Sequence, residues 1–419
     1  MYGLNYSPEL TGIGKYTGEM CAWLAARGHE VRVVAAPPYY PEWRVREDYR
    51  NSHYRVERGV GMPTVFRTTL YVPERPSGLK RVLHLASFML GSLPVMLRQI
   101  FWKPDVVFTV EPTFFCAPVA LMVARLCGSA AWLHVQDFEV DAAFDLGLLP
   151  AKGPMHGSAL WLERMFTRAF DRVSTISIKM VERLRAKGVA AGATVLFPNW
   201  VDVEAVHPLS GPNAFRRRLK LEEKLLVLYS GNIGNKQGLE LLAPLASAFA
   251  PGGSHEDARV HFLFCGDGAF RPQLEQLVRG LANVALVPLQ PLAKLNELLN
   301  AADIHLLPQR AGAADLVMPS KLTGMLSSGK PVLATADAGT QVAMVVDSGV
   351  HACGVVVPAE NPQALCAALS SLGADESERL RFGQNARRYA VQYLGREQVL
   401  TQFEADLRAA VEVRRTSVR

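Results

Sequence analysis

Short apolar runs alternate with longer helix-like patterns along most of the chain. The runs are rich in Val, Leu, Ile or Ala, and they cover residues 30–36, 105–110, 130–135, 173–176, 225–230, 260–265, 284–287, 304–307, 331–334 and 354–357. Helical patterns separate them, among them residues 13–26, 117–126, 160–170, 238–249, 268–277 and 293–301. This alternation predicts parallel strands joined by helical crossovers.

A cluster of Pro, Asn and Asp over residues 197–202, continuing to His207-Pro208, interrupts the alternation. We therefore predict an α/β protein with two Rossmann-like, doubly wound parallel-sheet domains, residues 1–203 and 204–386, facing an interdomain cleft. Residues 387–419 form an amphipathic pattern, predicted to be a helical tail packing back across the domains. Ligands of such sheets bind at the carboxyl ends of the strands. The first strand, before Ser7-Pro8, looks a few residues short.

The most apolar stretch covers residues 82–97, which carry no formal charge and are flanked by Lys80, Arg81, Arg98 and Lys103. Spanning a membrane takes about 20 apolar residues. We expect a helix lying near the headgroup plane, with its basic ends facing anionic lipid. A buried core helix is the alternative.

Composition and charge narrow the class of protein. The 419 residues are 49% hydrophobic and 20% charged, which excludes a disordered chain. Six cysteines without a C-x-x-C pair disfavour zinc-ribbon and thioredoxin folds and fit a reducing cytosol. The net charge is +6, and residues 43–103 hold 11 basic against 4 acidic residues. Nucleic acid, an acidic substrate, an anionic membrane or a plain surface excess could explain that patch; no nucleic-acid recognition motif accompanies it.

Several catalytic motifs are missing. The glycines that follow the first strand match neither the dinucleotide fingerprint nor a P-loop, and neither G-x-S-x-G nor H-E-x-x-H occurs. The ten histidines lack ligand spacing, and the nearest approach to a metal-holding Asp-x-Asp is Glu139-Val-Asp141. These residues therefore contain no recognisable metal-binding motif.

Two glycine-rich loops, each between a strand and a helix, are candidates for anion binding. The first contains Gly12 and Gly14; the second contains Gly231, Asn232 and Lys236. Backbone N–H groups at such a loop can approach a phosphate, and a loop lysine suits a diphosphate. A tight turn and a solvated lysine are the ordinary alternatives.

Further candidates lie in residues 310–324 and at the end of residues 130–135. Ser320 is placed to cap a helix, whereas Lys321 in its first turn opposes the helix dipole, which a bound anion would explain. Asp315 is the carboxylate of this segment. His134 and Asp137 follow a strand, where catalytic side chains gather, although His134 could be a satisfied core histidine.

Taken together, these motifs resemble the GT-B glycosyltransferases, specifically the retaining family-four type. The resemblance covers almost the whole chain and rests on elements in the family's order: residues 6–16, 25–31, 230–240, 266–268, 302–303 and 328–332. It is closer still to the members that build exopolysaccharides of the colanic acid type. It implies a nucleotide-diphosphate sugar, with GDP-fucose favoured, held by the second domain, and a lipid-linked oligosaccharide held by the first. The enzyme would be cytoplasmic and peripheral at the inner face of the plasma membrane.

The resemblance also implies roles for individual residues. Lys236 and the Ser320–Lys321 turn would neutralise the leaving diphosphate, so the resemblance implies that neither a metal ion nor a cofactor is needed. The first loop would cap the donor, and Leu289 and Gln290 would lie near the base. The sequence departs from the family at two places. Asn232 stands where the family usually has Arg. The family's pair of Glu falls at Leu316 and Gly324, which leaves Asp315 as the nearest carboxylate.

The mechanism expected is retaining transfer driven by electrostatic stabilisation of the departing phosphate. His134 or the backbone would orient the sugar, and the acceptor proton would pass to the leaving phosphate or to Asp137. His134 and Asp137 compete for the position of the family's catalytic histidine. Alternatives are a nucleotide-sugar epimerase or hydrolase of the same fold, and a non-catalytic sugar-nucleotide-binding scaffold.

Overall fold

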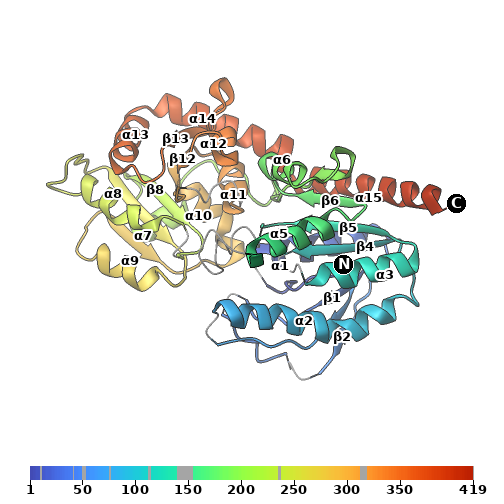
Figure 1. Cartoon of the computed structure of the whole chain (residues 1–419). Coiled ribbons are helices and arrows are strands. Elements are labelled where there is room, and N and C mark those ends of the chain that lie inside the picture. Colours follow the sequence, from blue (N-terminus) through green and yellow to red (C-terminus); the bar gives the residue numbers. More distant parts are fainter. Residues whose placement is uncertain are drawn as a thin grey trace. The chain divides into compact units, whose positions relative to one another are not determined.

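The chain forms two compact units in the computed structural model, which describes residues 1–9, 12–40, 42–49, 53–74, 77–111, 115–138, 154–234, 237–311 and 319–418. The first unit comprises Met1–Pro198 and Val399–Arg419, and the second comprises Asn199–Gln398 (Figure 1). The chain thus leaves the first unit at residue 198, where we predicted 203, and residues 387–398 of the predicted tail belong to the second unit.

The first unit is built on a mainly parallel sheet. Its strands are β1 (Arg32–Ala35), β2 (Arg55–Glu57), β3 (Thr64–Arg67), β4 (Val106–Glu111), β5 (Ala130–Val135), β6 (Arg172–Thr175) and β7 (Thr194–Leu196). Hydrogen bonds order them as β2-β3-β1 and β4-β5-β6-β7, and only β2 is antiparallel. Tyr2 forms parallel bridges to Val34 of β1 and Thr109 of β4, so the N-terminal segment lies between these two strands.

Helices flank this sheet (Figure 1). They are α1 (Gly12–Ala26), α2 (Gly78–Gln99), α3 (Cys116–Cys127), α5 (Pro154–Thr167), α6 (Ile178–Ala186) and most of α15 (Arg396–Val418). The C-terminal helix completes the core of the unit, because the Phe403 ring stacks on Phe197 with 4.0 Å between centroids. The next residue, Glu404, is buried and accepts hydrogen bonds from Arg27 at 2.7 Å and His29 at 2.9 Å. Residues far apart in the sequence therefore build one core.

Helix α2 contains the apolar stretch of residues 82–97. One face is buried, and its residues recur at helical spacing: His84, Phe88, Ser92, Met96 and Gln99. The other face exposes large apolar side chains: Leu79, Leu83, Leu90 and Leu97. The core-helix interpretation thus describes one face only. Within the described part of the chain, no helix has the length and apolar character needed to cross a membrane.

The second unit contains a fully parallel sheet of six strands. They are β8 (Leu225–Ser230), β9 (Val260–Cys265), β10 (Val284–Val287), β11 (Ile304–Leu307), β12 (Val332–Thr335) and β13 (Gly354–Val357). Their order is β10-β9-β8-β11-β12-β13. The chain first builds outward from β8 in one direction and then returns to start β11 on its other side. The boundary between β8 and β11 is thus a topological switch point, where doubly wound sheets bind ligands.

Apolar clusters cover both faces of this second sheet. The surrounding helices are α7 (Ala214–Leu219), α8 (Leu242–Phe249), α9 (Arg271–Leu277), α10 (Leu295–Ala301), α11 (Lys321–Ser327), α12 (Gln341–Val346), α13 (Pro362–Ala374) and α14 (Glu376–Tyr389). The prediction of two doubly wound parallel-sheet domains is confirmed. The tail predicted as one helical pattern is interrupted, because a π-helical turn, Ala390–Leu394, separates α14 from α15.

Candidate functional site

The loop after β8 lies at the switch point of the second unit and begins with Gly231. Its φ of +142° is a conformation that residues with a side chain rarely adopt. The Gly231 N–H donates to the carbonyl of Cys265 at 2.9 Å. A Cβ added at Gly266 would lie 1.9 Å from the Gly231 carbonyl oxygen, so the loops after β8 and β9 approach as closely as backbone can. Glycine at both positions is therefore a packing requirement of this edge.

Lys321 of α11 brings a half-buried amine to the same loop. Its Nζ donates to the Tyr229 hydroxyl at 2.9 Å and lies 4.1 Å from the centre of that ring. The Tyr229 hydroxyl in turn donates to the carbonyl of Asn232 at 2.6 Å. Burial lowers the pKa of Lys321 to about 7, and no carboxylate pairs with it among the residues that the structure describes. An amine held without a counter-ion is prepared for an anionic ligand.

Ser320 does not cap the helix, so that prediction is wrong. Its side chain is exposed and makes no capping hydrogen bond, because its backbone is already helical, with φ −60° and ψ −26°. The helix α11 itself begins at Lys321, as the Pro-Ser pair indicated. With seven residues α11 is short, so we assign the cost of placing Lys321 there to burial rather than to the helix dipole.

The remaining predicted donor residues are distributed around this edge. Asn232 is exposed beside Gly231, at the end of β8. Leu289 and Gln290 follow β10; Leu289 is exposed, and the Gln290 amide donates to the Pro288 carbonyl at 2.8 Å. Lys236 and Asp315 lie outside the described residues. The structure thus brings Gly231, Asn232 and Lys321 together, while Leu289 and Gln290 lie two strands away, along the same edge.

In the first unit, the loop before α1 is organised by Glu9. Its buried carboxylate accepts hydrogen bonds from the side chain of Asn5 at 2.9 Å and from the backbone N–H groups of Tyr39 and Tyr40 at 3.2 and 3.1 Å. Desolvation raises the pKa of Glu9. A Cβ at Gly14 would lie 2.6 Å from the Cβ of Glu9, whereas one at Gly12 would meet nothing within 4 Å. Gly14 therefore serves close packing, and Gly12, with φ +57°, serves the turn.

Asp137 lies beyond the end of β5 and is partly exposed. Burial raises the pKa of the nearby Tyr40 hydroxyl, and the negative charges of Glu9 and Asp137 raise it further. The Tyr40 hydroxyl thus interacts with Asp137 and with Glu9 of the first loop. Arg81, at the start of α2, acts on the same hydroxyl in the opposite direction. Asp137, Tyr40, Glu9 and Arg81 therefore share one electrostatic environment at the carboxyl edge of the first sheet.

His134, in contrast, is a buried residue of β5. The Ser174 hydroxyl lies 2.8 Å from its Nδ1, and the Gln136 amide nitrogen lies 2.9 Å from its Nε2. Burial lowers the pKa of His134 to about 3, so the imidazole is neutral at physiological pH. Both ring nitrogens are used within the protein, which is the environment of the core histidine that we considered as an alternative.

Sequence reasoning missed an aromatic cluster beside Asp137. Tyr39, Trp43 and His84 have ring centroids 4.9–5.7 Å apart, and the Tyr39 hydroxyl lies 3.0 Å from Nε2 of His84. Arg81 lies over the Trp43 ring at 5.5 Å. The repeated aromatics of residues 39–43 were the available signal, but the contribution of α2 could not be read from spacing. The structure also offers no group of three or more metal-binding side chains within its described residues.

Two doubly wound parallel-sheet units, the second with a glycine loop and a half-buried amine at its switch point, are the architecture of the GT-B fold. Two family models match the chain: the glycosyl transferase 4-like domain over residues 11–200 and the glycosyl transferases group 1 over residues 224–375. The chain belongs to this glycosyltransferase family.

Individual relatives agree with this assignment. The chain is 43% identical over 418 residues to WcaI of Escherichia coli (strain K12), described as a colanic acid biosynthesis glycosyl transferase, which covers 97% of this chain and 99% of the relative. Among solved structures, sucrose-phosphate synthase from Thermosynechococcus elongatus matches with a TM-score of 0.73 and 18% identity, covering 98% and 99% of the two chains. HepE of Anabaena in complex with UDP-glucose matches with a TM-score of 0.67 and 16% identity, covering 97% and 99%. These structural matches support the fold.

Proposed function

We propose that this glycosyltransferase moves a sugar from a nucleotide-diphosphate donor, with GDP-fucose favoured, onto a lipid-linked oligosaccharide during the synthesis of a colanic-acid-like exopolysaccharide. The long match to WcaI supports the polymer class. The single observation that carries the assignment of a diphosphate donor is the Lys321 amine, which is half-buried beside Gly231 without a carboxylate partner among the described residues.

The chemistry at the second unit is stabilisation of a leaving diphosphate. As the bond from the sugar to the diphosphate breaks, negative charge grows on the phosphate oxygens, and a preorganised cation lowers the energy of that state. The Lys321 amine would supply the charge, and the closely packed loop at Gly231 would let the phosphate approach the backbone. Lys236 is proposed to add a second cation. With amines in this role, transfer is proposed to proceed without a metal ion. Retention of the anomeric configuration is proposed from the resemblance to the retaining family-four enzymes.

The acceptor is proposed to bind at the carboxyl edge of the first sheet. Asp137 is partly exposed there and can accept the proton of the acceptor hydroxyl. His134 has both ring nitrogens bonded within the protein, which favours a positioning role through Gln136. In the aromatic cluster, Tyr39 and His84 are buried, whereas the Trp43 ring that packs on them is partly exposed and is of the kind that packs against sugars.

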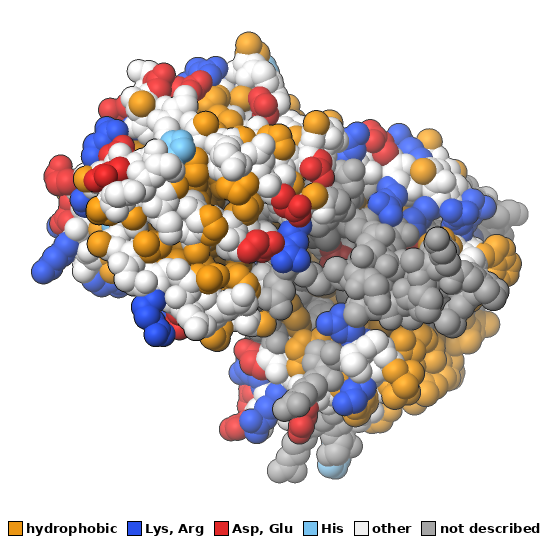
Figure 2. Space-filling model, turned by 60° about the vertical axis from the view of Figure 1, so that its left-hand side comes forward, with side chains coloured by type: hydrophobic (Ala, Val, Ile, Leu, Met, Phe, Trp, Pro, Cys, Tyr) orange, Lys and Arg blue, Asp and Glu red, His pale blue; other side chains and the backbone are white. Residues whose placement is uncertain are grey.

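A lipid-linked acceptor requires the enzyme to work at a membrane surface, and we propose that it does so as a peripheral protein at the cytoplasmic face. The exposed apolar side of α2 and the excess of basic residues in 43–103 support this orientation. Figure 2 shows hydrophobic side chains gathered over the lower part of the first unit, where α2 lies.

The test is a thermal-shift panel with GDP, UDP, dTDP and ADP, each with and without EDTA. We expect stabilisation by one diphosphate, unaffected by EDTA and lost in Lys321→Met. Lys294→Met is the matched control, because Lys294 is an exposed lysine of the same unit whose Nζ pairs with Glu297 at 3.3 Å. Stabilisation that requires a metal, or that survives Lys321→Met, would contradict the proposed donor site. To test the reaction, the enzyme is supplied with the sugar form of the stabilising nucleotide and with acceptor. NMR then shows whether the sugar is transferred and whether its anomeric configuration is retained in the product.

A further inference from the structure

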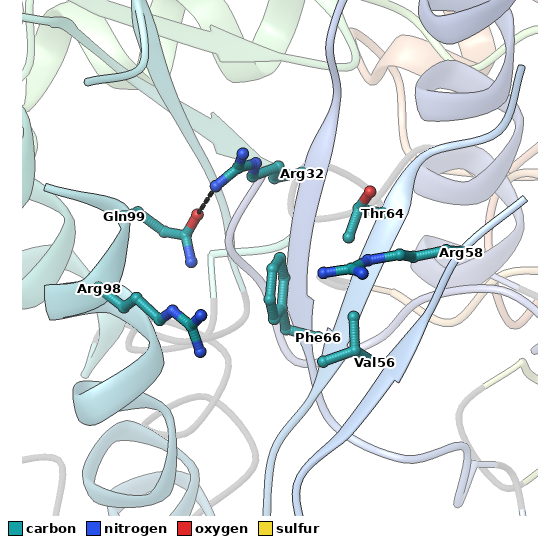
Figure 3. A pocket seen from close by; sticks show the side chains of 7 residues that line it. All are labelled: Arg32, Val56, Arg58, Thr64, Phe66, Arg98 and Gln99. Carbon is teal, nitrogen blue, oxygen red and sulfur yellow. Dashed lines mark hydrogen bonds between the residues drawn. The ribbon is translucent and has the colours of Figure 1, made fainter. Parts of the chain in front are cut away.

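A cavity lies in the first unit, at the end of the sheet opposite to Asp137. Its volume is about 330 Å³, and its walls come from the start of β1, the β2–β3 hairpin and the end of α2 (Figure 3). Arg32 and Thr64 are the first residues of the parallel strands β1 and β3 and lie side by side in the sheet. The proposed acceptor edge lies at the other ends of these strands, so the cavity is separate from it.

Three arginines line this cavity. Arg32 is held on three sides: its Nη2 lies 3.0 Å from Glu30, its Nη1 donates to the Gln99 amide oxygen at 3.4 Å, and its guanidinium covers the Trp102 ring at 4.2 Å. The Gln99 amide is fixed in turn, because its nitrogen donates to the Val95 carbonyl at 3.0 Å. The cavity therefore has a rigid, donor-rich wall.

The other two arginines, Arg58 and Arg98, are exposed and belong to opposite walls. Figure 3 shows their guanidinium groups directed toward each other across the Phe66 ring. Neither forms an ion pair with any carboxylate among the described residues, and no Asp or Glu lines the cavity. Glu30 offsets Arg32, so about two positive charges face the cavity without compensation. Guanidinium groups in such a fork recognise phosphate oxygens.

Exposed apolar side chains flank the same two walls. Val60 and Met62, at the tip of the β2–β3 hairpin, are 105% and 60% exposed. Leu97, in the last turn of α2, and Phe101, two residues beyond its end, stand on either side of Arg98 along the chain, and Phe101 is 89% exposed. A soluble phosphate needs only the arginines. Apolar side chains on both sides of a phosphate-sized basic cavity fit a lipid, whose headgroup and acyl chains have these two characters.

We propose that this cavity binds the phosphate of an anionic lipid headgroup, with the hairpin tip and the end of α2 inserted among the adjoining acyl chains. The inference rests on the proposed reaction at a membrane surface, and it identifies the site through which the protein would bind that surface. The apolar side chains would supply insertion, and the arginine pair would supply selectivity for anionic over neutral lipid.

The test is flotation of the full-length protein with vesicles of phosphatidylcholine alone or mixed with phosphatidylglycerol. The variant Arg58→Glu/Arg98→Glu should lose about thirty-fold or more of its affinity for the anionic vesicles, at about five-fold for each basic side chain at such a surface. The matched control is Arg125→Glu/Arg164→Glu, which reverses two exposed charges of the same unit, on α3 and α5, outside residues 43–103. We expect this control, and Arg217→Glu in the second unit, to change the affinity for the vesicles little.

Equal losses in the two double variants would mean a diffuse basic field and would overturn the site. A second outcome would also overturn the proposal. If the protein does not bind vesicles but binds inorganic phosphate by calorimetry, and if Arg58→Glu/Arg98→Glu abolishes that binding, the cavity is a site for soluble phosphate and not for a lipid. All variants should keep the nucleotide-induced thermal shift, which also reports folding. Loss of vesicle binding with turnover of a detergent-dissolved acceptor retained would leave the proposed function intact, whereas absent turnover in the parent protein would count against that function alone.

Discussion

The glycine loops of the two units carry similar sequence signals, yet their glycines have different neighbours. In the first unit, Gly14 packs against Glu9, whose carboxylate is already occupied by backbone N–H groups. In the second unit, Gly231 faces the amine of Lys321, which no carboxylate neutralises within the described residues. A glycine loop therefore indicates close approach, and the side chain opposite it decides whether the approaching group is protein or ligand.

The largest effect expected from this comparison is the loss of the amine. Lys321→Met keeps the apolar stem but removes the charge, and we expect sugar transfer to fall about 10²–10³-fold, the size seen when one preorganised donor to a developing anion is removed. Steady-state kinetics with saturating donor measures it. Lys294→Met should retain full activity, and an equal loss there would point to unfolding rather than to the site.

Adding a methyl group to each loop separates packing from binding. Gly14→Ala places its Cβ 2.6 Å from the Cβ of Glu9, so we expect a destabilisation of about 1–3 kcal/mol, typical of overpacking, with nucleotide binding retained. Gly231→Ala meets Lys321 at 3.5 Å in a backbone conformation unsuited to alanine, and it should weaken nucleotide binding. Urea unfolding and calorimetric titration of both variants check this; a Gly14→Ala protein that folds normally but fails to bind nucleotide would reverse the assignment.

The pH dependence of nucleotide affinity should reveal Lys321 directly. Its pKa is about 7 in the free protein, and a bound diphosphate raises it, so the complex binds a proton that the free protein lacks. Affinity should therefore be flat below pH 7 and fall by up to about ten-fold per pH unit above it. The free protein should gain stability over the same range, up to the ordinary value of 10.5, because there the unfolded chain binds more protons.

Calorimetry in buffers of different ionisation enthalpy measures this proton uptake, and Lys321→Met should abolish both pH effects. Uptake of similar size in the Lys321→Met variant would show that another group titrates.

The smallest effect is expected at Gly12. Its side-chain position is open, so Gly12→Ala should cost only the strain of a left-handed conformation, about 1–2 kcal/mol. The unfolding midpoint should shift accordingly, while the nucleotide-induced thermal shift stays unchanged. A loss of that shift would mean that the first loop also binds the donor, so that the two loops would have the same role.

Local sequence patterns were sufficient to predict the strands that are buried along their whole length. The strands β5, β8, β9, β10, β11 and β13 occupy the predicted residues, because each is a short apolar run within a doubly wound unit. The strands β2, β3 and β7 were not predicted, since they are three or four residues long and include charged or exposed positions. Hydrophobic periodicity carries little information in such segments.

The sequence indicated individual candidate residues of the site, but it did not indicate which residues they contact. Lys321 was singled out from its own segment, but its partner Tyr229 lies 92 residues earlier, and no spacing rule connects them. His134 was selected for its place at a strand end; the Ser174 hydroxyl that occupies its Nδ1 comes from a strand 40 residues later. Whether a histidine at a strand end is free to act on a substrate depends on such distant partners, which the local sequence does not reveal.

The place of α15 in the first unit has a consequence for the order of folding. Phe403 and Glu404 complete the core and an ion cluster of a unit whose other residues end at Pro198. During synthesis, this unit emerges from the ribosome first but cannot close until the last segment has been made. The second unit, whose chain is continuous, can mature while the first still exposes the apolar surface that Phe403 will cover. The earliest-made half of the enzyme is therefore the last to be finished.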